Sequence, residues 1–434
     1  MSTDLLWLCT LAVFVLPVYC QTGNPVEGEL DSAANTTGTR SAPTLQFVIV
    51  VSRHGNRAPV FDFPSSPYQS DDTNMWPNGN GELTQSGYDQ MYKLGKKVRA
   101  LYDGFLDQTF RPEDFKALSS TSGRTLQSAE LFLAGLFPPR GFQIWNKDLL
   151  WQPVPVHPTF LDHYELVFLN EKPLCSRFRE AQEDALMETE NLNNSSLVSF
   201  IDYVLPFTGI DENKLHVEIG SAYKAQIVFI VWEAIINAVN NGIPLTEWAS
   251  KLYPEPLTSL VEKFYYASAV GSLDQIKYLE GEMFQEMVRL MQSKANGTLS
   301  PDTRMYFYSG HDCTIMGLMM MMLKNVEDKI GFVNTGSALI YELHQDPQSG
   351  SFYVQVLYID GASPNLEPSA VNIPSCGSPC DLHQLLNITE EYYNITDWEE
   401  ECHVIPPMPS LGEEEESKER NLTNEILEIG LVFP

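Results

Sequence analysis

Three short apolar segments stand out along the chain, and each is followed by a polar loop. They are rich in β-branched and aromatic residues, which is typical of strands buried on both faces of a parallel sheet. The three candidate strands cover residues 45–51, 115–120 and 305–309. Beyond each loop, apolar residues recur at helical spacing over residues 83–101, 125–136 and 314–323. Strands that alternate with helices predict an α/β fold with a mainly parallel sheet flanked by helices.

The middle of the chain has a different pattern. Prolines interrupt it near residue 155, and long helical patterns follow, among them residues 223–239 and 273–291. We therefore predict a smaller, mainly helical cap inserted at residues 142–300. It would divide one α/β catalytic domain into a first part at residues 44–141 and a second part at residues 301–405.

The second part of the predicted catalytic domain contains a hairpin. Its two strands are predicted at residues 337–344 and 352–360, joined by a turn that contains Pro347 and Gly350. From residue 406 to residue 434 the chain is rich in proline and glutamate, which predicts an acidic disordered tail.

The N-terminus has the pattern of a secretory signal. An apolar run from Leu5 to Val18 is too short to cross a bilayer comfortably, and small and polar residues follow it. We predict a signal peptide at residues 1–20 and a flexible leader at residues 21–43. A short N-terminal anchor stays open as an alternative, because the segment before the run contains Asp4 and no Lys or Arg. No other segment is long and apolar enough to predict an integral membrane anchor.

Charge and sequons agree with a lumenal destination. The chain carries 27 Lys and Arg residues against 57 Asp and Glu residues, a net charge of -30. That balance argues against nucleic acids as partners, because their phosphates would repel it. Asn-x-Ser/Thr sequons, which predict glycosylation in a secreted protein, occur at Asn35, Asn193, Asn194, Asn296, Asn387, Asn394 and Asn421. We expect secretion, with the lysosomal lumen as the alternative.

Cysteines outside the signal region are odd in number. They are Cys175, Cys313, Cys376, Cys380 and Cys402, so four can pair and one stays free. Cys376 and Cys380, with His383 and Cys402 downstream, are also compatible with a zinc site. A local disulfide is the favoured interpretation in an oxidising compartment.

Candidate chemistry follows the three predicted strands. Arg53, His54 and Arg57 follow the first strand, Arg124 follows the second, and His311 with Asp312 follows the third. Because ligands bind at the carboxyl ends of parallel strands, we expect these six side chains to line one site.

These six residues suit phosphoryl transfer. Three guanidinium groups match the geometry of phosphate oxygens and stabilise the charge that develops on them. A histidine between the arginines can attack phosphorus, because the neighbouring positive charge favours its neutral form. A carboxylic acid at Asp312 can protonate the leaving group. We therefore expect a hydrolase that uses neither a metal nor another cofactor.

Several strings resemble the histidine acid phosphatases, especially the prostatic and lysosomal type. Residues 47–59, which contain Arg-His-Gly-Asn-Arg, are similar to the first motif of that family. Residues 309–314 resemble its second catalytic motif, and residues 120–129 resemble its distant-arginine segment. The similarity extends from about residue 45 to residue 403. It implies a phosphoglycerate-mutase-like fold and hydrolysis of phosphate monoesters at acidic pH without a metal.

The resemblance also implies roles for particular residues. His54 would be the nucleophile and Asp312 the proton donor, with phosphate bound by Arg53, Arg57, Arg124 and His311. Disulfides would join Cys175 to Cys402 and Cys376 to Cys380. A homodimer contact would include Trp151 and His157.

Two positions depart from the family pattern. Asn56 stands where the prostatic type has aspartate, and Cys313 stands where threonine usually follows the His-Asp pair. We expect Asn56 to shift the pH profile or specificity, and we expect oxidation or metal binding at Cys313 to inhibit. Two alternatives to an acid phosphatase remain at this point. One is a catalytically weak, secreted ligand-binding protein, and the other is a phytase-like enzyme.

Overall fold

A computed structural model describes residues 39–159, 161–164, 175–323 and 331–403. The described residues belong to one compact unit. The predicted signal peptide, most of the predicted leader and the whole of the predicted acidic tail lie outside the described residues, as do Asn35 and Asn421. Among the described helices, none combines the length and the apolar character that a bilayer crossing requires.

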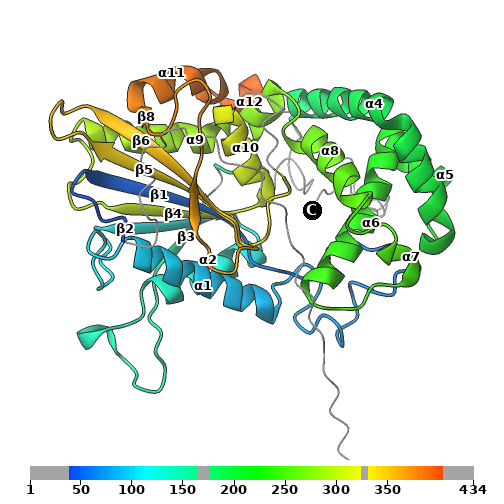
Figure 1. The fold of residues 1–434 in the computed structure, drawn as a ribbon, viewed down its shortest axis with the longest axis horizontal. Helices are drawn as coiled ribbons and strands as arrows, with labels where there is room; N and C mark the ends of the chain where they lie inside the picture. The colour runs from blue at the N-terminus through cyan, green and yellow to red at the C-terminus, as the bar shows by residue number, and fades with distance from the viewer. Residues whose placement is uncertain (1–38, 160, 165–174, 324–330, 404–434) are drawn as a thin grey trace, which may run out of the picture. The chain divides into compact units, whose positions relative to one another are not determined.

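A mixed eight-stranded sheet forms the centre of the fold (Figure 1), with strand order β3-β2-β4-β1-β5-β6-β7 and β8 paired to β6. The parallel half contains β1 (Leu45–Arg53), β2 (Phe115–Ser119), β3 (Val156–Pro158) and β4 (Met305–Gly310). The antiparallel half contains β5 (Ala338–Gln345), β6 (Phe352–Ile359), β7 (Pro368–Ala370) and β8 (Cys380–Asp381). The α/β fold is confirmed, and every predicted strand is present within two residues of its predicted ends.

β3 lies inside the range predicted as a helical cap. Its residues pair with β2 in parallel, from Ala117 opposite Val156 to Ser119 opposite Pro158. A three-residue strand has no period long enough to detect, so only pairing with β2 identifies it. The division into domains at residues 142 and 300 stays a prediction.

Helices cover both faces of the sheet. In Figure 1, α1 (Gln85–Leu101) and α2 (Gly123–Leu136) lie below it, and α9 (Leu273–Ala295), α10 (Asp312–Leu323) and α11 (Leu382–Tyr393) lie above it. Alternate residues of β1 pack in different apolar clusters on the two faces of the sheet. Phe47, Ile49 and Val51 belong to one cluster, and Val48 and Val50 belong to the other. The unbroken apolar run of β1 therefore has a physical cause, because both faces of the strand are buried.

The helices between residues 176 and 269 lie within the range predicted as the cap. They are α4 (Ser176–Thr208), α5 (Glu212–Ile219), α6 (Tyr223–Asn240), α7 (Glu247–Ser250) and α8 (Leu257–Ala269), with the short η2 (Gly220–Ala222) between α5 and α6. The predicted helix at 223–239 corresponds to α6, whose side chains are buried over most of its length. Figure 1 shows these helices beside the end of the sheet where β1 and β4 terminate.

The described residues contain two disulfides. Cys175 pairs with Cys402, which joins the residue before α4 to the residue after α12 (Trp398–Glu401), and Cys376 pairs with Cys380. The zinc alternative for Cys376 and Cys380 is therefore wrong. Cys313 is free and fully buried.

Candidate active site

The register of the parallel strands brings three loops to one edge of the sheet. Arg53 at the end of β1 lies opposite Gly310 at the end of β4, and Ser119 at the end of β2 lies opposite Ser309. Backbone bonds continue beyond the strands: His54 N donates to Gly310 O at 3.0 Å, and Ser120 N donates to Ser309 O at 3.0 Å. The loops that carry the predicted site residues are therefore held side by side.

His54 lies at the centre of this edge and is 2% exposed. Its Nδ1 lies 2.8 Å from the carbonyl oxygen of Gly55, so Nδ1 carries the proton in a hydrogen bond to that oxygen. The lone pair of the neutral ring is then on Nε2. Burial, followed by the charges of Arg53, Arg124 and Arg57, holds the pKa of His54 well below its usual range. The low pKa favours the neutral ring, the form that a nitrogen nucleophile needs.

His311 faces His54, with ring centroids 5.7 Å apart. Its Nε2 lies 2.9 Å from Ser120 Oγ, and Tyr164 stacks on its ring at 3.8 Å. Burial and then the charges of Arg124 and Arg53 lower the pKa of His311 well below its usual range. Within the described residues, its Nδ1 is buried without a hydrogen-bond partner. Such an atom can bind a further polar group.

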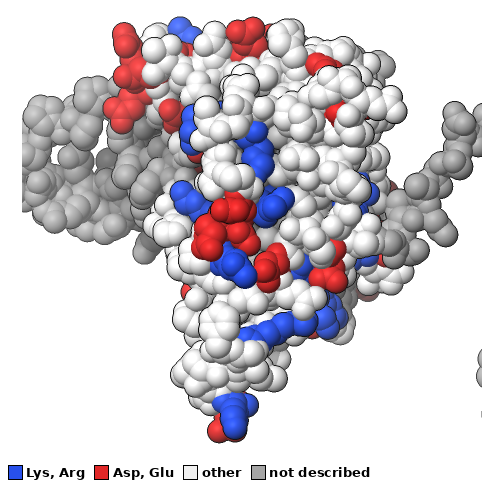
Figure 2. Space-filling view, turned by 90° about the vertical axis from the view of Figure 1, so that its left-hand side faces the viewer, with Lys and Arg blue, Asp and Glu red and all other residues white. Residues whose placement is uncertain are grey.

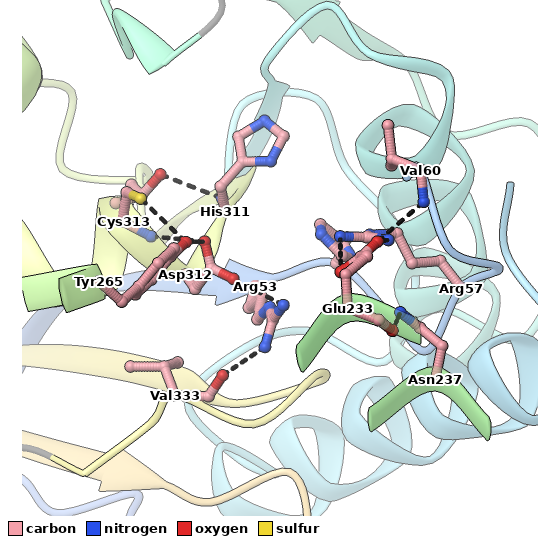
Figure 3. Close-up of polar contacts among 12 residues, drawn as sticks. Arg53, Arg57, Val60, Glu233, Asn237, Tyr265, His311, Asp312, Cys313 and Val333 are labelled. Carbon is pink, nitrogen blue, oxygen red and sulfur yellow. Dashed lines mark hydrogen bonds and ion pairs between the residues drawn. The ribbon is translucent and has the colours of Figure 1, made fainter. Parts of the chain in front are cut away.

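Asp312 receives donors from three directions. Arg53 Nη2 lies 2.6 Å from Oδ2, Tyr265 Oη donates to Oδ1 at 2.5 Å, and the N–H of Cys313 donates to Oδ1 at 2.9 Å. Figure 3 shows Arg53 between Asp312 and the carbonyl of Val333, to which its Nη1 donates. The guanidinium also lies over the ring of Phe332, 5.2 Å from its centroid. The structure thus pairs the predicted acid directly with one of the predicted phosphate ligands.

Arg57 pairs with a carboxylate from the cap. Its Nη1 donates to Glu233 Oε1 and its Nη2 donates to Oε2 at 3.3 Å, with both side chains buried. Glu233 Oε1 also accepts from the N–H of Val60 at 2.8 Å (Figure 3). These bonds join α6 to the loop after β1 and hold the direction of the Arg57 guanidinium.

Arg124 is half-buried in the first turn of α2. Its charge is among the causes that lower the pKa values of both His54 and His311. Arg124 is therefore within electrostatic reach of both rings, and all six predicted side chains converge on one place.

Three residues of this site were not predicted from the sequence. They are Tyr164, Glu233 and Tyr265, and each lies inside the range predicted as the cap. Glu233 and Tyr265 lie on helices that are buried over most of their length, and no local pattern shows which polar side chain on such a helix will face the strand ends. Only tertiary packing brings them to the strand ends.

Neither departure from the family pattern removes a site contact. Asn56 is buried, and its Oδ1 accepts from Thr84 Oγ1 at 2.7 Å. Cys313 Sγ lies 3.1 Å from Tyr265 Oη, and burial followed by the charge of Asp312 raises the pKa of this thiol well above its usual range. A thiol held protonated is a poor nucleophile and a poor metal ligand. Within the described ranges, no cluster of three or more His, Cys, Asp or Glu residues is arranged to hold a metal ion.

Comparison with known proteins identifies the family. The profile of the histidine phosphatase superfamily (branch 2) matches residues 44–359, so the chain belongs to that family. It is a hydrolase of the phosphoric monoester class.

Curated relatives cover most of the chain. Human lysosomal acid phosphatase is 32% identical over 84% of this chain and 81% of its own length. Mouse prostatic acid phosphatase is 31% identical over 83% of this chain and 90% of its own length.

Solved structures share the fold. A phytase from Hafnia alvei in complex with tartrate has a TM-score of 0.57 at 18% identity, and the match covers 84% of this chain and 99% of that one. A phytase from Citrobacter braakii has a TM-score of 0.55 at 17% identity, over 80% of this chain and 98% of that one. At such identities the likeness concerns the fold alone.

Proposed function

We propose that this protein is a secreted acid phosphatase that hydrolyses phosphate monoesters through a phosphohistidine intermediate on His54. The observation that carries the proposal is the tautomer of His54. Nδ1–H is bonded to Gly55 O, so Nε2 holds the lone pair, and the low pKa keeps it unprotonated in acid. Those are the requirements for a nitrogen nucleophile at acidic pH.

In the first step, Nε2 of His54 attacks phosphorus in line with the ester oxygen. The P–N bond forms as the P–O bond breaks, and Asp312 gives its proton to the leaving oxygen. Arg57, Arg124 and His311 stabilise the charge on the equatorial oxygens. Nε of Arg53, Nε of Arg57 and Nδ1 of His311, which have no hydrogen-bond partner in the described chain, supply donors for this purpose.

In the second step, Asp312 takes a proton from water as the water oxygen attacks phosphorus. The P–N bond breaks, inorganic phosphate leaves, and the electron pair returns to Nε2. The ion pair with Arg53 holds the Asp312 carboxylate in position for both steps.

The experiment is an assay with an aryl phosphate at acidic pH, comparing wild type with His54→Ala. We expect His54→Ala to reduce kcat by at least about a thousandfold, since it removes the nucleophile. Brief mixing with a phosphorus-labelled substrate, followed by an alkaline quench, should trap label on wild type only, and acid treatment should release it, because the P–N bond of phosphohistidine is stable in base and hydrolysed in acid. Hydrolysis that persists in His54→Ala would overturn the proposal, as would label on another residue.

The same assay separates the alternatives. A ligand-binding protein without turnover would bind phosphate esters and release no phosphate. A phytase-like enzyme would prefer inositol hexakisphosphate to an aryl phosphate. The net charge of -30 disfavours a highly anionic substrate, so we propose simple monoesters as the substrate class.

Secretion and glycosylation belong to the same proposal. Two disulfides fit an oxidising compartment. Among the described sequons, Asn194, Asn296, Asn387 and Asn394 are exposed, as a glycan acceptor must be in the folded protein. Asn193 is half-buried, and its Nδ2 donates to the carbonyl of Thr189. The lysosomal lumen remains the alternative destination.

A further inference from the structure

A chain of hydrogen bonds behind the ring of His311 ends at a carboxylate that the proposed reaction does not use. The backbone N–H of His311 donates to Thr314 Oγ1 at 3.0 Å, and the Thr314 hydroxyl donates to Asp162 Oδ2 at 2.8 Å. His311 precedes α10 and Thr314 is its third residue, so the first bond is half of a helix capping box. A capping box does not require the Thr314 hydroxyl to bond to another side chain, so helix capping does not explain the bond to Asp162.

Asp162 also bonds to the backbone of the residue whose ring lies against His311. Its Oδ1 accepts from the N–H of Tyr164 at 2.9 Å, and the Tyr164 ring stacks on the His311 ring with planes 16° apart. Tyr164 and Thr314 are fully buried, and Asp162 is 7% exposed. The Asp162 carboxylate thus bonds to two residues that contact His311. Thr314 bonds to the backbone of His311, and Tyr164 stacks on its ring.

The segment that carries Asp162 is anchored independently. His163 Nε2 lies 2.7 Å from Glu282 Oε2 on α9, and the His163 ring stacks on Trp398 at 4.1 Å. Space around the carboxylate is also limited: a Cβ on Gly310 would lie 3.0 Å from Asp162 Oδ2 and 2.9 Å from Thr314 Oγ1. A rigid support on one side and a glycine on the other fix where His311 lies.

We infer that Asp162 is a positioning residue that orients His311 for phosphate binding, through Thr314 and through Tyr164. The inference rests on the proposed function, because it takes His311 as a phosphate ligand. It adds a residue outside the strand-end motifs, on the segment that leads from β3 to the cap. If a hydrogen-bond donor to the phosphate is displaced, it stabilises the transition state much less, and small errors in its position cost up to about a hundredfold in rate.

The test measures kcat/KM for an aryl phosphate and the inhibition constant of inorganic phosphate. We expect Asp162→Ala to lower kcat/KM by about ten- to a hundredfold and to raise the phosphate inhibition constant in parallel. Asp162→Asn, which keeps an oxygen for the Tyr164 N–H, should lose less than Asp162→Ala. Asp211→Ala is the matched control, because Asp211 likewise accepts from backbone N–H groups but caps α5 away from the site.

Coupling to His311 separates positioning from general damage. In a His311→Ala background, Asp162→Ala should cost less than about twofold, because the side chain that it orients is gone. A full additional loss in that background would overturn the inference, as would unchanged phosphate inhibition in Asp162→Ala.

A second pair of variants covers poor folding of Asp162→Ala. Thr314→Val removes the middle hydroxyl and should reproduce the loss, whereas Thr314→Ser keeps the hydroxyl and should restore activity. Equal activity in these two variants would overturn the inference. If wild type shows no hydrolysis that depends on His54, the proposed function is refuted and the inference is refuted with it. If wild type is active but the losses caused by Asp162→Ala and His311→Ala are additive, the inference alone is refuted.

Discussion

Glu233 is the cap residue in closest contact with the predicted machinery, since its carboxylate pairs with the buried guanidinium of Arg57. Glu233→Gln keeps the shape of the side chain and removes its charge, which leaves Arg57 buried with a weaker partner. We expect a loss of about 1–3 kcal/mol in the free energy of unfolding and a fall in kcat/KM of about tenfold or more as Arg57 reorients. Chemical denaturation and steady-state kinetics measure the two effects.

Glu247→Gln serves as the control for Glu233→Gln. Glu247 pairs with Lys251 on the surface of the cap, where the Glu247 side chain is 87% exposed. An exposed ion pair contributes little, so this variant should match wild type in both measurements. Equal behaviour of the two variants would contradict the role assigned to Glu233.

The low pKa of His54 makes a prediction for the pH profile. Burial comes first among its causes, and the charges of Arg53, Arg124 and Arg57 follow. Protonation of His54 in the free enzyme would abolish attack, so a pKa below the ordinary value of about 6.5 moves the acid limb of kcat/KM to lower pH. Arg124→Gln removes one of the charges and should move that limb upward in pH, in addition to lowering the rate.

The same shift has a consequence for stability. A histidine whose folded-state pKa is lowered binds fewer protons than the same residue in the unfolded chain, so its contribution lowers stability as pH falls below about 6.5.

Arg140→Gln, at an exposed position, is the control for the kinetic effect of Arg124→Gln, and its pH profile of kcat/KM should superimpose on that of wild type. An acid limb that stays in place in Arg124→Gln would contradict the contribution of the Arg124 charge to the low pKa of His54.

At the scale of elements, α1 lies against the loop that carries the site. A Cβ on Gly87 would lie 2.0 Å from the carbonyl oxygen of Asn56, a distance that the backbone cannot accept. Helix propensity alone would favour Gly87→Ala by about 1 kcal/mol. We expect the opposite sign, with lower stability and lower kcat, because the loop from Arg53 to Arg57 has to move.

Gly123 provides the comparison for Gly87. It lies in the first turn of α2, and the nearest atom to an added Cβ is Glu82 Oε1 at 3.5 Å, an ordinary contact. Gly123→Ala should therefore leave the melting temperature unchanged or raise it. A melting temperature for Gly87→Ala at or above that of wild type would contradict the packing argument.

At the scale of the whole molecule, the two disulfides close loops of very different length. Cys175 and Cys402 are separated by 227 residues, whereas Cys376 and Cys380 are separated by 4. Because the entropy removed from the unfolded chain grows with loop length, replacing the first pair by serine should cost about 2–5 kcal/mol. Replacing the second pair should cost less, and thermal unfolding of the two variants checks the order.

The exposed loop between α2 and β3 makes a prediction about association. It contains η1 (Gly141–Gln143) and forms the projection below the sheet in Figure 1 and at the bottom of Figure 2, where most of its surface is uncharged. Phe142 is 87% exposed, and Trp145, Leu150 and Trp151 are exposed as well. Such a patch exceeds what isolated surface residues account for, so we expect a homodimer through Trp151 and His157, which is also exposed.

Sedimentation velocity tests the homodimer directly. Wild type should sediment as a dimer, and Trp151→Asp should shift the population to monomer. A wild-type protein that is monomeric at micromolar concentration would contradict the prediction.

The sequence alone predicts the longer strands β1, β2, β4, β5 and β6, the helices α1, α2, α6, α9 and α10, and the six residues of the candidate site, but not the short strands β3, β7 and β8 or the helix α11. Long apolar runs and helical periods are local signals, and parallel strands that end in polar loops bring those loops together by geometry alone. Glu233, Tyr265 and the pair Asp162 and Tyr164 were decided only by tertiary structure. They act across contacts between segments far apart in the chain, and no local period records which buried polar group will meet which partner.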